Sequence, residues 1–84
     1  MTQITILDHV EFDDGSTNEI SATIVHAGVI IHYADTVYTV HWETMDDVEH
    51  LSKLFADMTV RVFKVAVKLL GSIHANQDAY TLLL

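Results

Sequence analysis

The chain is predicted to be an α+β domain: a four-stranded antiparallel β-meander packed on one long C-terminal amphipathic helix. Three observations predict this class. Apolar and polar residues alternate through the first 43 residues, turn-forming residues interrupt the alternation, and apolar residues recur at three and four positions after residue 44. Its 84 residues are enough for one domain. We therefore assign residues 1–84 to a single unit, with the sheet at 2–43, the helix at about 45–71 and a tail at 72–84.

Alternation in the first strand puts four apolar residues on one face, which are Ile4, Ile6, Val10 and Phe12. The run Asp-Asp-Gly-Ser at 13–16 predicts a hairpin, because Gly15 can adopt the positive φ that the turn needs. A three-residue loop at 14–16 would pair Phe12 with Asn18 and Val10 with Ile20.

Two further turns are predicted at Ala27-Gly28 and Ala34-Asp35. The first would pair Ile24 with Ile31, and the second would pair Ile31 with Tyr38. In these registers one face of every strand is apolar. Because a slip of one residue would turn a whole strand over, this agreement supports the meander.

The helix is expected to begin at Thr44-Met45-Asp46-Asp47, which resembles an N-cap followed by acids. The apolar and polar stripes keep their phase across 57–59, which predicts one helix ending near Gly71. The alternative is two helices with a break near Thr59. The tail is expected to form a short fifth strand or an arm.

Cysteine is absent, which excludes a disulfide scaffold and any thiolate metal site. The N-terminal residues lack the features of a signal peptide, and no apolar run has the length of a membrane span. We therefore expect a cytoplasmic protein without a membrane partner.

The net charge is −8, and residues 1–50 hold ten acids and no lysine or arginine. Such a surface repels phosphate backbones, so we expect no direct nucleic-acid binding. It attracts basic surfaces, so we expect a protein target with a basic surface. The first and third turns of a meander lie at the same end, where a protein-binding cluster is predicted at Glu11, Asp13, Asp14, Glu19 and Asp35. The alternatives are a DNA mimic and turns that merely aid solubility.

Catalysis is not expected. The six histidines do not converge in the predicted register, and no nucleophile or phosphate-binding motif is present. We therefore predict no catalytic residues, no metal and no cofactor.

The apolar arc of the helix widens from about 120° in its first half to about 220° in its second half, more than one sheet can cover. The chain's own tail or a second copy must bury the rest. We therefore expect a homodimer, and the predicted self-association residues are Val60, Phe63, Val67, Leu70, Tyr80, Leu82 and Leu84.

In size and charge the chain is similar to small inhibitors such as bacteriocin immunity proteins and phage anti-defence proteins, including anti-CRISPRs. From the acidic first fifty residues beside the wide apolar helix face, we expect a non-enzymatic, dimeric binding protein that acts as an inhibitor by masking a basic site on its target. The alternative is an assembly subunit that oligomerises through its helix and tail.

Overall fold

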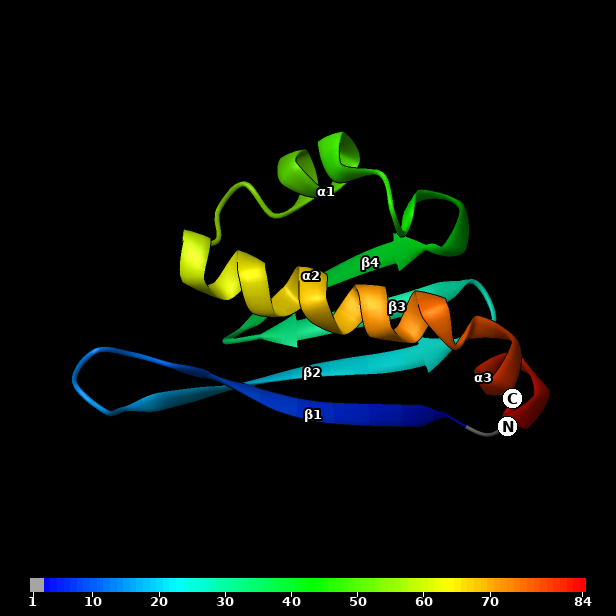
Figure 1. Cartoon of the computed structure of the whole chain (residues 1–84), viewed down its shortest axis with the longest axis horizontal. Coiled ribbons are helices and arrows are strands. Elements are labelled where there is room, and N and C mark those ends of the chain that lie inside the picture. The colour runs from blue at the N-terminus through cyan, green and yellow to red at the C-terminus, as the bar shows by residue number, and fades with distance from the viewer. Residues whose placement is uncertain (1–2) are drawn as a thin grey trace.

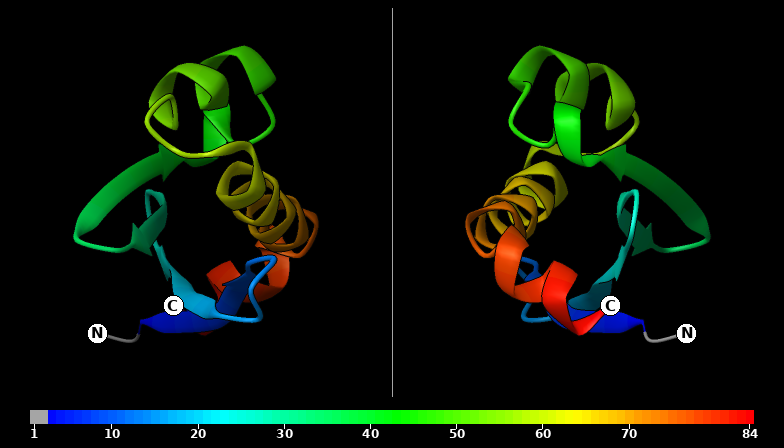
Figure 2. Two further views of the ribbon diagram at one scale, coloured as in Figure 1. Left: turned by 90° about the vertical axis from the view of Figure 1, so that its left-hand side faces the viewer. Right: turned by 90° about the vertical axis from the view of Figure 1, so that its right-hand side faces the viewer.

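The computed structural model describes residues 3–84. In the described part an antiparallel sheet in the order β1-β2-β3-β4 is followed by a 3-10 turn and three α-helices, which makes the class α+β (Figure 1). The helices lie on one face of the sheet (Figure 2). The elements are β1 (Ile4–Glu11), β2 (Thr17–Val25), β3 (Gly28–Tyr33), β4 (Thr36–His41), η1 (Trp42–Thr44), α1 (Val48–Leu54), α2 (Val60–Ala75) and α3 (Gln77–Leu83).

The four-stranded meander and its apolar face are as predicted, and the pairing of β3 with β4 has the predicted register, with Ile31 opposite Tyr38. The other two registers were predicted wrongly by two residues. Val10 lies opposite Asn18 rather than Ile20, and Ile24 lies opposite Val29 rather than Ile31. A shift of two residues leaves each side chain on its own face, so the apolar face is unchanged. The predicted start of the sheet at residue 2 lies outside the described residues.

The first register differs because the loop of the hairpin is one residue earlier than predicted. The amide of Phe12 donates to the carbonyl of Ser16 at 2.9 Å, which makes 13–15 the loop. Gly15, with φ of +86°, is then its last residue. Three-residue hairpin loops place their left-handed residue there.

The second register differs because Gly28 belongs to β3 and not to the turn, which is formed by residues 26 and 27. A Cβ atom on Gly28 would lie 2.0 Å from the carbonyl oxygen of Val40. Glycine is therefore needed here for the close approach of β3 to β4.

The core lies between the inner sheet face and the helices. Its fully buried members come from all four strands, from α1 and α2 and from the residues that flank α1, and they include Ile20, Ile31, Val40, Phe55 and Leu70. None of the helices in residues 3–84 combines the length and apolar character that crossing a bilayer requires.

The single helix predicted at 45–71 is wrong, since α1 and α2 are separate and the break lies near Thr59, as in the alternative. Three contacts account for the break. The carboxylate of Asp57 accepts the hydroxyl of Tyr38, the hydroxyl of Thr59 caps α2 by accepting from the amide of Val62, and the ring of Phe55 packs edge-on against Tyr38 with centroids 5.1 Å apart. The chain turns here because residues 55–59, the linker between α1 and α2, are held on the sheet by these contacts.

The helix ends also differ from the prediction. Asp47, not Thr44, is the N-cap of α1, where its side chain accepts from the amide of His50. Helix α2 continues through Gly71 to Ala75, because a helix tolerates one interior glycine at modest cost. The expected fifth strand is not formed: the tail forms α3, and its Tyr80 and Leu84 pack against the core.

Candidate protein-binding site

The predicted acidic residues lie mainly at one end of the sheet, which we call the hairpin end: the β1–β2 hairpin and the β3–β4 turn (Figure 1). Asp13 and Asp14 are in the hairpin loop, Glu11 ends β1, and Asp35 is in the β3–β4 turn. Glu19 is on β2 opposite His9, on the sheet face that the helices leave uncovered. The topology thus brings the hairpin acids and Asp35 to one end, with Glu19 beside them.

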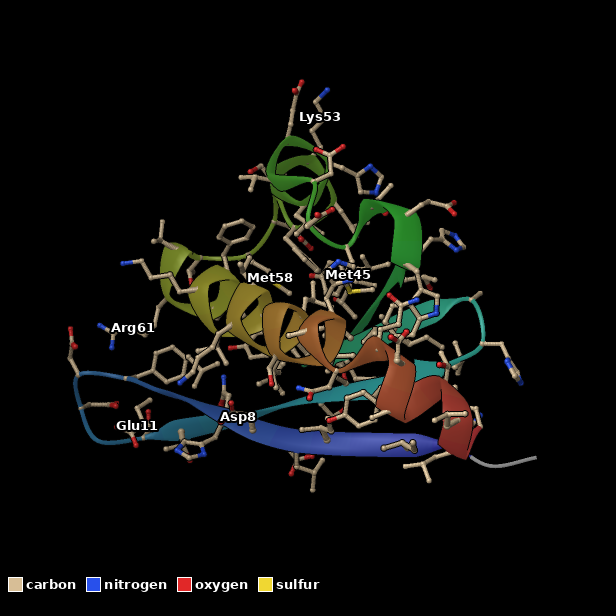
Figure 3. All side chains as sticks on the ribbon, turned by 45° about the vertical axis from the view of Figure 1, so that its right-hand side comes forward. Asp8, Glu11, Met45, Lys53, Met58 and Arg61 are labelled. Carbon is tan, nitrogen blue, oxygen red and sulfur yellow. The ribbon has the colours of Figure 1, made fainter. Side chains whose placement is uncertain are left out.

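Arg61, in the first turn of α2, ties the hairpin to the helices. Its guanidinium donates to the backbone carbonyl of Glu11 at 2.9 Å and to the carboxylate of Asp13 at 2.7 Å. Figure 3 shows Arg61 extending from α2 toward the strand that carries Glu11. Asp13 is therefore already paired within the chain, while the hairpin is held in a defined position.

Asp14 shapes the loop and keeps its charge. Its carboxylate accepts from both the hydroxyl and the amide of Ser16, at 2.6 and 2.9 Å. These bonds, the hydroxyl first, lower the pKa of Asp14 below its ordinary value. The loop therefore presents a negative charge throughout the physiological pH range.

A hollow of about 240 Å³ lies at the same end, between the sheet and the α1–α2 linker. Its volume is several times the roughly 30 Å³ that one water molecule occupies. Aromatic side chains and one carboxylate contribute to its wall, together with small and apolar groups. The lining residues are Phe12, Tyr33, Ala34, Thr36, Tyr38, Asp57, Met58, Thr59 and Val62.

Hydrogen bonds fix the polar groups of this hollow. The hydroxyl of Tyr38 lies 3.0 and 3.1 Å from the two carboxylate oxygens of Asp57, and it donates to that carboxylate. The hydroxyl of Tyr33 accepts from the side-chain amide of Asn18 at 3.0 Å. Burial, and then the hydrogen bond to Asp57, raise the pKa of the Tyr38 phenol. Asp57 thus presents a carboxylate, positioned by Tyr38, in a wall that Phe12 and Tyr33 also line.

The sequence prediction missed this hollow because Asp57 was assigned to the solvated stripe of a continuous helix. The available signal was Thr59 directly before the apolar run of α2, which is the pattern of an N-cap. A break at Thr59 would have put Asp57 in a linker, where its side chain can contact the sheet.

The predicted self-association residues do not form one surface. Leu70 is fully buried in the chain's own core, and Phe63 packs edge-on against Phe55 with centroids 6.1 Å apart. The fold of α1 against α2 thus covers part of the wide apolar arc. Val67, Tyr80 and Leu84 are half-buried.

Two members of that set remain well exposed, Val60 at 70 % and Leu82 at 87 %. Val60 begins α2 and Leu82 is in α3, at opposite ends of the helical layer (Figure 1). They therefore cannot belong to one compact contact patch with each other.

Within residues 3–84, no three histidine, aspartate or glutamate side chains are grouped closely enough to hold a metal ion. Comparison of the chain with protein-family models, with curated proteins and with solved structures found no match.

Proposed function

We propose that this protein is a small non-enzymatic binding module that masks a basic site on a partner protein, and that the hollow at the hairpin end receives a lysine or arginine side chain of that partner. Occupation of a basic site blocks access to it, so the protein acts as an inhibitor of its target. The observation that carries the proposal is the Asp57 carboxylate beside the rings of Phe12, Tyr33 and Tyr38.

The chemistry of this wall suits a cation. Aromatic faces attract ammonium and guanidinium groups by about 0.5–2 kcal/mol, and a carboxylate adds a charge-assisted hydrogen bond. The hydroxyl of Tyr38 already orients Asp57, so little further ordering is needed when the ligand binds.

The charge of the surroundings acts in the same direction. The chain carries −8 overall, and Asp14 and Asp35 are exposed at the same end as the hollow. An acidic surface accelerates the approach of a basic partner, and this attraction becomes weaker as the salt concentration rises. The acids therefore supply attraction at a distance, and the hollow supplies the specific contact.

The direct test uses side-chain mimics rather than an unidentified target. Butylammonium and butylguanidinium ions are titrated into the full chain while the ring signals of Phe12, Tyr33 and Tyr38 are followed by NMR. We expect saturable shifts confined to the hollow, and about tenfold weaker binding to Asp57→Asn, which removes the charge but keeps an acceptor for Tyr38.

Two controls make the test decisive. Butanol has the same chain length without a charge, and Asp46→Asn removes an exposed acid between η1 and α1. Equal binding of butanol, or equal losses in Asp57→Asn and Asp46→Asn, would show that the hollow is not a cation site.

The partner itself can be tested with two triple variants of equal charge. Each changes the net charge from −8 to −8 + 3 × 2 = −2, one at the hairpin end and one among the acids that run from η1 to the first turn of α1. A partner retained from lysate must be lost with the first triple and kept with the second. The two sets are Glu11→Lys, Glu19→Lys and Asp35→Lys, against Glu43→Lys, Asp46→Lys and Glu49→Lys.

A further inference from the structure

Strand β1 is an edge of the sheet. Among the described residues it pairs only with β2, and its other side forms the lower border of the molecule in Figure 1. A free edge exposes backbone donors and acceptors that another strand can pair with, and natural proteins usually block such edges. The two halves of β1 differ in how far they are blocked.

The direction of each backbone group follows from the hairpin. The amide of Phe12 donates to the carbonyl of Ser16, the residue directly before β2, so the backbone groups of the even-numbered residues of β1 face β2. The alternation of an antiparallel ladder then turns the odd-numbered residues toward the free edge. Two side-chain bonds agree with this: the amide of His9 and the carbonyl of Glu11 are bound by side chains and not by β2.

The half of β1 near the hairpin is therefore blocked by its own side chains. The carboxylate of Asp8 accepts the amide of His9 at 2.8 Å, and Arg61 occupies the carbonyl of Glu11. Asp8 lies on the inner face of the edge strand, a position where a charge discourages pairing with another chain.

The other half of β1 is open. No side chain in residues 3–84 is hydrogen-bonded to the backbone of Thr5 or Leu7. Ile4 and Ile6 lie on the inner face but are only half-buried, whereas their neighbours on β2 are fully buried. Leu7 is 64 % exposed, and the run 3–7 contains no charged side chain.

We propose that a second copy of the chain pairs with this open half, antiparallel and with a two-fold axis through Thr5. Thr5 then lies opposite Thr5 of the second copy, and the odd-numbered residues exchange the backbone hydrogen bonds that are free at the edge. Ile4 of each copy meets Ile6 of the other, so the half-buried isoleucines cover one another. The two sheets become one eight-stranded sheet.

A second copy fits this edge better than a strand of another protein because the register is self-complementary and avoids the charges. In an antiparallel pair the hairpins point in opposite directions. The Asp8 residues of the two copies are then six positions apart, or roughly 20 Å, which is beyond the screening length of about 8 Å at physiological salt. Both hollows stay free, so this inference stands apart from the proposed function.

The absence of cysteine gives a clean test of the register. In Thr5→Cys the two thiols would face each other across the two-fold axis, with Cα atoms about 5.5 Å apart, which is within disulfide range. Mild oxidation should convert Thr5→Cys to a covalent dimer at least tenfold faster than Thr39→Cys, which carries the same change on the opposite edge strand β4. Equal rates would overturn the proposal.

Light scattering on the full chain provides the second test. The native protein should be a dimer, and Leu7→Lys should lower the affinity of the two copies for each other at least tenfold. The control is Val37→Lys, which introduces the same charge at a residue that is 58 % exposed on β4 and should leave the dimer intact. Thr5→Pro, which removes an amide that β2 does not use together with the exposed hydroxyl contact to Thr23 at 3.3 Å, should also give monomers with a native circular dichroism spectrum. A native protein that is monomeric at 1 mM (roughly the highest practical concentration), or a dimer lost only in Val37→Lys, would refute the pairing.

Discussion

The two ends of the sheet are joined to the rest of the molecule by different chemistry. At the end that holds the β2–β3 turn, which we call the turn end, contacts are mainly apolar and tightly packed. Ile24, Val29 and Val40 are fully buried there, and Gly28 lies directly against the backbone of β4. The indole of Trp42 donates to the carbonyl of His26 at 2.8 Å and so holds the turn itself.

At the hairpin end polar side chains add to the apolar contacts of Val10, Ile20 and Phe55, which are also fully buried. Phe12 and Tyr33 are only half-buried, and the helical layer is attached through Arg61 to the hairpin and through Asp57 to Tyr38. Because apolar burial supplies most of the stability, these polar contacts position the hairpin end more than they stabilise it. The hairpin end can then keep a hollow and exposed charges that a packed core would not allow.

The largest effect is expected at the turn end. Gly28→Ala would place a Cβ atom against the backbone of Val40, which cannot rotate away, and should reduce the free energy of unfolding by about 3 kcal/mol. Urea denaturation followed by circular dichroism measures this loss.

Gly71→Ala is the matched control, because a Cβ atom there meets nothing within 4 Å and the residue lies inside α2. Alanine is the better helix former, so this change should stabilise the chain by about 0.5–1 kcal/mol. A similar loss in the free energy of unfolding in both variants would mean that the close contact of Gly28 with Val40 is not required and that the turn end is not tightly packed.

The sequence predicted the sheet well for a physical reason. A period of two fixes which face each side chain occupies, so the strands and the inner face were predicted correctly even where the pairing was not. The pairing of β1 with β2 depends on where the left-handed glycine stands in the loop, and that of β2 with β3 depends on the contact of Gly28 with Val40. Neither is visible in an alternation of apolar and polar residues.

The helices were predicted less well because the apolar residues keep the same helical spacing on both sides of the break, so that their periodicity does not reveal it. Leu51, Phe55 and Val62 are all buried and keep the helical spacing, although the linker lies between them. The acids of the hairpin end could be placed from the meander topology alone. The hollow could not, since Asp57 reaches it only after the chain leaves the helix.

The second prediction concerns the bond between Tyr38 and Asp57 at the hairpin end. Tyr38→Phe keeps the ring against Phe55 but removes the hydroxyl, and should cost about 1 kcal/mol because Asp57 is exposed and regains water. Tyr80→Phe, the same change on a half-buried tyrosine of α3, is the control. Urea denaturation measures the free energy of unfolding of both variants. Equal small losses would mean that the hydrogen bond between Tyr38 and Asp57 does not help to hold the linker on the sheet.

The same tyrosine gives a pH dependence. Burial and then the Asp57 hydrogen bond raise the pKa of Tyr38 in the folded state above its unfolded value near 10. Its contribution to stability is therefore complete below that pH and is lost as pH rises toward and through the folded pKa. Stability should fall more steeply above pH 10 (roughly the unfolded pKa) in the native chain than in Tyr38→Phe, and parallel curves would contradict the shift.

The smallest effect on stability is expected at Arg61. Its side chain is 47 % exposed and that of Asp13 is 92 % exposed, so water and salt screen the pair. Arg61→Ala should lower the free energy of unfolding by only about 0.5 kcal/mol. Amide hydrogen exchange should nevertheless accelerate in the hairpin loop, because Arg61 binds only the hairpin. It should not accelerate at Ile24 or Val29, which belong to the buried core at the turn end. Lys64→Ala, one turn further along α2, should leave the exchange unchanged. Faster exchange at both ends would mean that the two ends unfold as one unit and that Arg61 does not act on the hairpin end alone.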